Sequence, residues 1–371
     1  MQYDVGIVGA GFAGLACARA AARRGLRVLV IDRKPAAGVR MHTTGLVVKE
    51  AAERWEIPAT ITRRVRGIRL YAPTRGSLDL DAAGYYFLAT DTPALMRWLA
   101  REAARAGAHL RFAHPFRGAR NVEGGIELAV SGLRVRCLVG ADGPRSAVAA
   151  GFGLGRNREF LIGVEAEFRG VAGVDPDRLH CFLDRELARG YIGWAVPGHD
   201  GVTQIGLACR RPQRPDLAAF LRKVAPHFDF SRAQRVGWRG GLIPVGGPVT
   251  PMAGRDVMLI GDAAGLVSPL SAGGIHTALE SGWAAAQAIA DHQLEGAGDP
   301  GRALACSTPR FVGKRTLRAI YDRGIPDAAF DAMLSTRAFT ALARSVYFHH
   351  RGLRSAEGWR DLAQTLLRGH P

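Results

Sequence analysis

Three glycines near the start of the chain have the spacing of a turn that binds a dinucleotide. Gly9, Gly11 and Gly14 follow a short apolar run at residues 3–8, which is typical of a buried strand. Gly9 permits a tight turn, Gly11 lets the backbone approach a pyrophosphate, and Gly14 lets the next helix pack closely on the sheet. The order of strand, glycines and helix predicts a phosphate-binding turn.

The residues after this turn complete a β-α-β unit. An Ala-rich helix is predicted at 12–24, ending at Gly25, and its N-terminus offers unpaired N–H groups to phosphates. A second apolar run at 27–31 leads to Asp32, whose carboxylate can accept hydrogen bonds from ribose hydroxyls. Arg33 follows directly, and we count it with the cofactor-binding residues.

A second segment exposes one carboxylate at the end of a buried strand. The apolar run 257–260 ends at Gly261 and Asp262, and small residues follow as far as Gly265. Asp262 could bind the hydroxyls of a polyol, such as the ribityl chain of a flavin dinucleotide. It could also simply cap a helix, which aspartate does well.

The same segment continues through Pro269 to a pair of glycines that open a helix. Gly273, Gly274 and Ile275 would place bare N–H groups at the helix N-terminus. We expect them to face the pyrimidine edge of a flavin ring, where negative charge accumulates on reduction and where a helix dipole is stabilising.

A third segment lies between these two in the chain. The strand predicted at 133–141 leads directly into Asp142 and Gly143, which are turn residues. Alone they are a moderate signal, but their place between the two other motifs predicts that all three complete one cofactor site.

The order of these motifs resembles the flavoprotein superfamily of aromatic hydroxylases, flavin halogenases and geranylgeranyl reductases. Within it, the segment from Gly261 to Ile275 is most similar to the geranylgeranyl reductase family, because aromatic hydroxylases usually have His where this chain has Gly265. Tyr191 and Trp194 lie in a segment that resembles that family's substrate motif. The resemblance covers roughly residues 3–290 and implies tightly bound FAD and reduction of carbon–carbon double bonds in isoprenoid chains.

The candidates for catalysis lie on the substrate side. In the loop expected at 36–46, Arg40 could meet a phosphate or carboxylate, and His42 stands where the family often has Cys. His42 could donate a proton or a hydrogen bond to substrate, or be an exposed loop histidine. Tyr191 and Trp194 could wall a hydrophobic channel, or pack within the second domain's sheet. His276, early in the helix after Gly274, is expected on the helix surface.

The composition excludes several classes of protein. The net charge is +17, almost all of it from dispersed arginines without the aromatic interleaving of single-strand binders, so no nucleic-acid partner is expected. No apolar stretch approaches the roughly 18 residues of a membrane span, so no transmembrane helix is expected. Because the first predicted strand begins almost at Met1, no signal peptide is expected either. The scattered cysteines form no CxxC pair, which predicts reduced thiols, no metal site and a cytoplasmic location.

The expected fold is an α/β fold: a Rossmann-like FAD-binding domain, an inserted antiparallel β-sheet substrate domain, and a C-terminal helical region. The FAD domain is assigned to 1–75, 90–160 and 245–295, the substrate domain to 76–89 and 161–244, and the helical region to 296–371. Thr92 is expected to cap a helix. The C-terminal helices could rest on an anionic membrane or, the favoured interpretation, pack as a cap on the FAD domain.

The leading hypothesis is an FAD-dependent oxidoreductase that reduces an alkene in a hydrophobic, lipid-like substrate, with His42 or a neighbour as the acid. An external reductant, NAD(P)H or ferredoxin, would supply the electrons. A monooxygenase using flavin hydroperoxide is the main alternative. A halogenase and a non-redox flavin-dependent cyclase or isomerase remain as further alternatives.

Overall fold

Parallel strands form the centre of the first sheet, whose order is β17-β18-β11-β1-β2-β8 with β10 and β9 continuing beside β11. The structure is a computed structural model, and it describes residues 2–74, 76–129, 132–324 and 326–348. The strands of this sheet are β1 (Gln2–Val8), β2 (Val28–Ile31), β8 (His109–Arg111), β9 (Ala119–Val122), β10 (Gly125–Leu128), β11 (Arg134–Gly140), β17 (Ala253–Gly254) and β18 (Val257–Leu259). The predicted Rossmann-like unit is confirmed, since β1 pairs in parallel with both β2 and β11.

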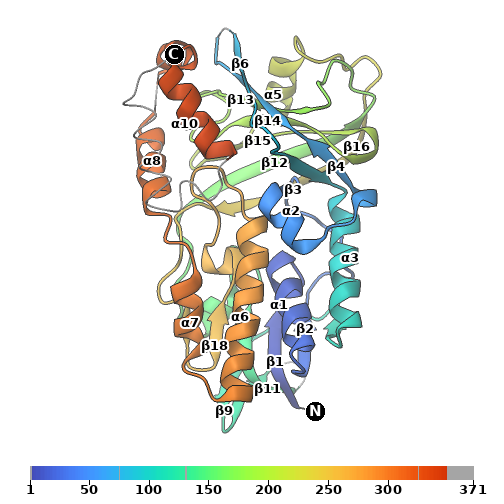
Figure 1. The fold of residues 1–371 in the computed structure, drawn as a ribbon, viewed down its shortest axis with the longest axis vertical. Helices are drawn as coiled ribbons and strands as arrows, with labels where there is room; N and C mark the ends of the chain where they lie inside the picture. The colour runs from blue at the N-terminus through green and yellow to red at the C-terminus, as the bar shows by residue number, and fades with distance from the viewer. Residues whose placement is uncertain (1, 75, 130–131, 325, 349–371) are drawn as a thin grey trace.

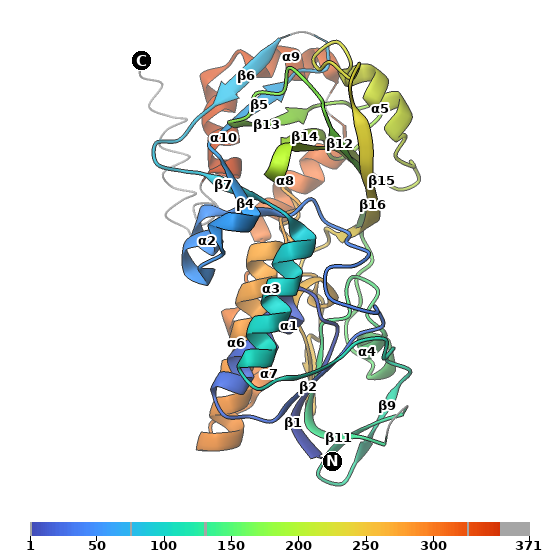
Figure 2. The same cartoon turned by 90° about the vertical axis from the view of Figure 1, so that its right-hand side faces the viewer.

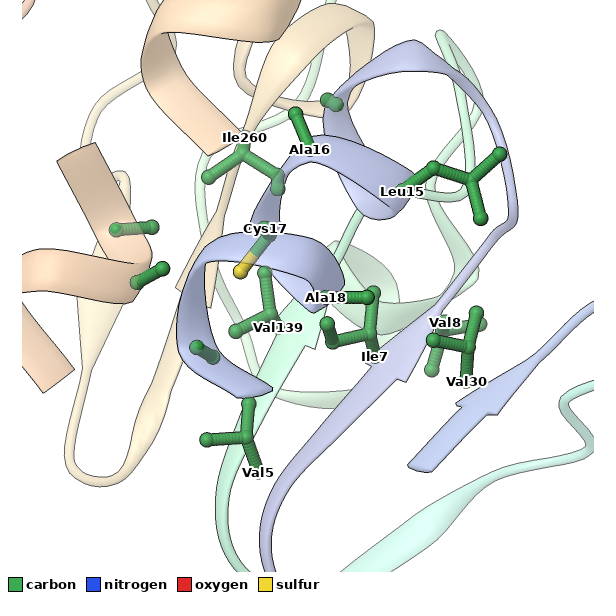
Figure 3. Close-up of a cluster of buried hydrophobic side chains, with 14 of the residues drawn as sticks. Val5, Ile7, Val8, Leu15, Ala16, Cys17, Ala18, Val30, Val139 and Ile260 are labelled. Carbon is green, nitrogen blue, oxygen red and sulfur yellow. The ribbon is translucent and has the colours of Figure 1, made fainter. Parts of the chain in front are cut away.

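Helices cover this sheet, and the longest of them, α6 (Ile275–Glu295), runs along the long axis of the molecule (Figure 1). They are α1 (Phe12–Arg23), α2 (Lys49–Trp55), α3 (Thr92–Arg105), α4 (Ala147–Gly151), α6 (Ile275–Glu295) and α7 (Pro300–Ser307). Figure 3 shows buried side chains of β1 and β11, among them Ile7 and Val139, beneath Cys17 and Ala18 of α1. Asp91 rather than Thr92 caps α3, because the Asp91 carboxylate accepts the Ala94 N–H at 2.9 Å while Thr92 is already helical.

The second sheet occupies the other end of the molecule (Figure 2) and is mainly antiparallel. Its strands, in spatial order, are β16 (Gln234–Pro244), β12 (Phe160–Arg169), β15 (Val202–Arg210), β14 (Gly193–Pro197), β13 (Arg178–Phe182), β5 (Gly67–Tyr71) and β6 (Ser77–Leu80). The alternating sequence at 164–168 predicted this antiparallel pairing, and Val164 indeed faces Leu207. Because β5 pairs with β13, we propose that the boundary of the first domain falls before Gly67 instead of after residue 75.

A small third sheet lies between the two halves. It consists of β3 (Leu46–Val48), β7 (Phe87–Thr90) and β4 (Thr62–Val65), and β7 sends Leu88 into the Rossmann core and Phe87 into the core of the second half. Short 3-10 turns are η1 (Ala59–Ile61), η2 (His199–Gly201) and η3 (Gly261–Ala264).

The two faces of the second sheet are covered by different helices. On one face, Phe182 packs with Phe220 of α5 (Leu217–Val224). On the other, Cys181 packs in a cluster with Phe330, where α9 (Asp327–Leu334) and α10 (Arg337–Tyr347) follow α8 (Val312–Asp322). The expectation that the C-terminal helices cap the FAD domain is wrong for α9 and α10, whose apolar side chains pack in the cluster on the second sheet. It holds for α7, which packs against α6 and β17 of the first domain. Residues 349–371 of the predicted helical region lie outside the described residues.

Candidate cofactor and substrate site

The strands of the first sheet bring the predicted motifs to one edge. Ile31 lies opposite Val8, Val8 opposite Gly140, and Gly140 opposite Leu259, so four parallel strands end at the same level. The residues that follow each strand begin the predicted cofactor motifs. In open α/β sheets, ligands bind in the crevice outside these carboxyl ends.

The glycine turn has the geometry that phosphate binding requires. A Cβ atom on Gly9 would lie 2.3 Å from the Ala141 carbonyl oxygen, and one on Gly14 would lie 1.9 Å from the Gly9 carbonyl oxygen. Gly11, the N-cap of α1, has no atom within 4 Å of its Cβ position. The backbone at Gly11 is thus open to a ligand at the helix N-terminus.

Asp32 holds the glycine turn against β2. Its Oδ2 accepts the Ala10 N–H at 2.7 Å and its Oδ1 accepts the Lys34 N–H at 2.7 Å. Each carboxylate oxygen keeps a further lone pair for a ribose hydroxyl. Arg33 and Arg40, the two predicted cations in the segment that follows β2, are both exposed.

Asp142 presents a buried oxygen that lacks a partner. Its Oδ2 accepts N–H groups from Ala147 at 2.6 Å and Val148 at 3.1 Å, at the start of α4. Its Oδ1 is buried and has no hydrogen-bond partner among the described residues. Buried polar atoms are nearly always paired, so this oxygen needs a donor from outside the chain. Gly143 beside it, with φ of 85°, has no atom within 4 Å of its Cβ position. The residues present fit a hydroxyl-rich nucleotide such as FAD.

Asn157 ties the second and third motifs together. Its Nδ2 donates to the Pro144 carbonyl at 3.1 Å and to the Asp262 carbonyl at 2.8 Å. Sequence reasoning missed this residue because both of its bonds go to distant backbone carbonyls, which leave no pattern in the sequence.

Burial raises the pKa of the Asp262 carboxyl to about 6. A donor that approached this carboxylate would stabilise its charged form and lower this pKa.

The loop at 268–274 closes this edge of the site. Gly274 is the N-cap of α6, which begins at Ile275, and a Cβ there would lie 3.5 Å from Oδ1 of Asp262. The Gly273 carbonyl accepts the Ser268 N–H at 3.0 Å, and the Pro269 carbonyl accepts Nη1 of Arg318 at 3.4 Å. The predicted helix N-terminus and the predicted carboxylate therefore lie side by side.

Gly265 excludes the histidine that aromatic hydroxylases usually have. It adopts the left-handed conformation, with φ of 70°, and a Cβ would lie 2.3 Å from the Gly247 carbonyl oxygen.

The expectation that His276 lies on the helix surface is wrong, because this side chain is only 5% exposed in the close packing at the start of α6.

Tyr191 and Trp194 lie on the face of the second sheet that meets this loop. The Tyr191 hydroxyl donates to the Ser271 carbonyl at 2.6 Å, and the Trp194 indole N–H donates to Oε2 of Glu165 at 2.7 Å. Both rings pack with apolar residues of the sheet and with Ala272. Their polar atoms are used within the protein, so what they can offer a substrate is apolar surface.

His42 is exposed and contacts β16. Its Nδ1 lies 2.9 Å from the Gly240 carbonyl oxygen, which can only accept, so Nδ1 carries the proton. Partial desolvation of the ring lowers the pKa of His42, and the charges of Lys34 and Arg33 lower it further, while the bond to Gly240 acts in the opposite direction. Near pH 7 the ring is therefore neutral, with an unprotonated Nε2.

Comparison with known proteins gives consistent results. Residues 7–72 match a family model described as an NAD(P)-binding Rossmann-like domain. Digeranylgeranylglycerophospholipid reductase 2 from Methanopyrus kandleri is 31% identical over 316 residues, which cover 78% of this chain and 78% of that protein. A solved geranylgeranyl bacteriochlorophyll reductase-like protein from Thermoplasma acidophilum aligns at 22% identity with a TM-score of 0.82, over 98% of this chain and 99% of that one. The myxobacterial chondrochloren halogenase CndH aligns at 18% identity with a TM-score of 0.70, over 100% and 98% of the two chains.

The structural similarities confirm the predicted fold. The sequence identity to digeranylgeranylglycerophospholipid reductases extends over most of both chains, and it confirms the resemblance to the geranylgeranyl reductase family. The chain belongs to the digeranylgeranylglycerophospholipid reductase family.

Proposed function

We propose that this protein is an FAD-dependent reductase that saturates carbon–carbon double bonds in an isoprenoid lipid. The observation that carries the proposal is the meeting of three motifs at one sheet edge, in a chain 31% identical to a digeranylgeranylglycerophospholipid reductase. The apolar wall of Tyr191 and Trp194 beside this edge suits a substrate without charge along its chain.

Most of the predicted cofactor residues receive a role in this proposal. Gly9, Gly11 and Gly14 leave room for the pyrophosphate at the start of α1, and Asp32 binds the ribose. Asp142 and Asp262 bind hydroxyls of the ribityl side. The start of α6, at Gly273 and Gly274 between Pro269 and Ile275, stabilises negative charge by its dipole. FAD, when bound, supplies the two electrons of the reduction.

His42 is the candidate for delivering a proton. Its Nδ1–H is held by Gly240, so only Nε2 can carry a proton to the substrate, and only after the ring is protonated. We further propose that an external donor, NAD(P)H or ferredoxin, supplies the electrons, and that the protein works in the cytoplasm at the membrane surface.

The test uses the purified protein. It should be yellow and release FAD on denaturation. After chemical reduction without oxygen, it should saturate digeranylgeranylglycerophospholipid, with a mass gain of two hydrogens per double bond. A colourless protein that binds no added FAD would contradict the proposal. Oxygen consumption with substrate hydroxylation would instead indicate the monooxygenase alternative.

We also propose that α8 contacts an anionic membrane surface. None of the helices in the described part of the chain is both long and apolar enough to cross a bilayer. In α8, however, the usual burial pattern of a surface helix is reversed. Lys314 and Arg318 are buried, whereas Val312 is 67% exposed and Ile320 is 50% exposed. Residues two apart on a helix point about 200° apart, so Val312 and Ile320 point outward while Lys314 and Arg318 point inward, and the outward face also carries Arg315. The exposed Arg323 adds the positive charge that anionic lipid attracts.

Sedimentation with lipid vesicles tests this contact. The protein should sediment with phosphatidylglycerol vesicles and much less with phosphatidylcholine vesicles. The double variant V312D/I320D should lose most of this binding. V236D is the matched control, since Val236 is 52% exposed on β16 of the second sheet. Equal loss in the control would contradict a specific contact through α8.

A further inference from the structure

The second sheet holds a buried group of charges that the proposed site does not use. Glu165 on β12 is 2% exposed and Arg239 on β16 is 7% exposed, and the two residues are directly paired across the strands. Nε of Arg239 lies 3.3 Å from Oε1 of Glu165, and Nη2 of Arg239 also pairs with Glu167. A buried ion pair adds little net stability, because desolvation opposes the attraction. Its presence therefore calls for another reason.

One oxygen of Glu165 joins two separate parts of the site. Oε2 accepts the Thr44 hydroxyl at 2.6 Å and the Trp194 indole N–H at 2.7 Å. Thr44 belongs to the loop that carries His42, and Trp194 belongs to β14. The carboxylate therefore fixes the loop and the apolar wall relative to each other.

Arg239 fixes the same loop one residue earlier. Its Nη1 donates to the Thr43 carbonyl at 2.6 Å, and the next residue on β16, Gly240, accepts from Nδ1 of His42. Three consecutive loop residues, 42–44, are thus each bonded to β12 or β16. Charge-assisted bonds of this kind are about twice as strong as neutral ones, so the pair can hold the loop rigidly.

We propose that Glu165, held by Arg239, is a positioning residue that sets Trp194 and the loop 42–44 as one unit and so determines how the isoprenoid chain is held. The part of this inference that concerns substrate rests on the proposed function. The part that concerns Trp194 is measurable without substrate.

The first readout is the indole N–H resonance of Trp194 in ¹H–¹⁵N spectra of the FAD-loaded protein, assigned with W194F. A carboxylate acceptor moves this resonance downfield. We expect it to move upfield in E165Q and to shift in T44V, which removes one donor from the shared oxygen. T62V is the matched control, because the Thr62 hydroxyl faces only the Pro58 and Ala59 carbonyls.

The second readout is the affinity of the oxidised protein for digeranylgeranylglycerophospholipid in mixed micelles. T44V and E165Q should weaken it roughly three- to tenfold, as expected for one lost bond to a charged group acting through a neighbour. If E165Q does not fold, the Trp194 resonance and the lipid affinity of T44V alone test the inference. An unchanged resonance, or unchanged affinity in T44V, would overturn the inference. If the wild-type protein neither binds nor reduces the lipid while the resonance still shifts, the proposed function fails and the anchoring of Trp194 stands.

Discussion

Asp142 is the residue whose environment most directly requires a ligand. One carboxylate oxygen holds the start of α4, and the other is buried without a partner among the described residues. D142N keeps an acceptor for α4 but replaces the orphaned oxygen by an NH₂ donor. We expect FAD affinity to fall by about tenfold or more, the value of a bond to a charged group. Titration of FAD into apoprotein measures it. D216N, which changes the cap of α5, should bind FAD normally.

The lowered pKa of His42 leads to a prediction about the pH dependence of alkene reduction. Its pKa is lowered below the usual 6.5, so its protonated fraction grows only as the pH falls through the acid range. If His42 is the acid, single-turnover alkene reduction by pre-reduced protein should rise as the pH is lowered from about 8 to about 5. H42Q should remove this rise and reduce the rate by about a hundredfold at low pH. A wild-type rate that is flat or rises toward high pH would exclude His42 as the proton donor.

Among the elements, those with a strong local signal were predictable from sequence. The strands and glycines around Gly9, and the alternation at 164–168, are dictated by backbone sterics and by one buried face. The placement of β5 was not predictable, because a strand sequence does not say which sheet it joins. The packing position of α9 and α10 was missed for a similar reason: an apolar stripe on a helix predicts that this face is buried, but not which surface covers it. Glu165 and Arg239 were missed because their pairing spans distant strands.

The contact between α1 and α6 can be tested at Gly282. A Cβ there would lie 2.2 Å from the Ala13 carbonyl oxygen and 3.0 Å from the Cys17 nitrogen, both in the backbone of α1. G282V must push the helices apart, so we expect a loss of about 1–3 kcal/mol in unfolding free energy. FAD affinity should also weaken, because the N-terminus of α1 moves. Urea unfolding measures the first effect. G298A, at a position with no atom within 4 Å of its Cβ, should change little.

Across the whole molecule, α8 connects the surface to the cofactor edge. The Tyr321 hydroxyl donates to the Tyr191 carbonyl at 2.6 Å, and the Tyr191 hydroxyl donates to the Ser271 carbonyl at 2.6 Å. Arg318, on the same helix, bonds the Pro269 carbonyl. The helix proposed to touch the membrane therefore also holds the loop at the start of α6. A displacement of α8 on contact with lipid would therefore be transmitted to that loop through these bonds.

Removing one of these bonds tests the connection. Y321F keeps the ring but loses the hydroxyl, so the segment around Tyr191 is held less firmly. We expect faster amide hydrogen exchange in peptides that cover Tyr191 and residues 268–274, because local opening becomes easier when a bond of about 1 kcal/mol is lost. Y85F is the matched control, since the Tyr85 hydroxyl donates to Glu50 at 3.0 Å, outside this chain of bonds. If both variants exchange alike in these peptides, α8 covers the site without controlling its loop, and membrane contact there would leave the cofactor edge unaffected.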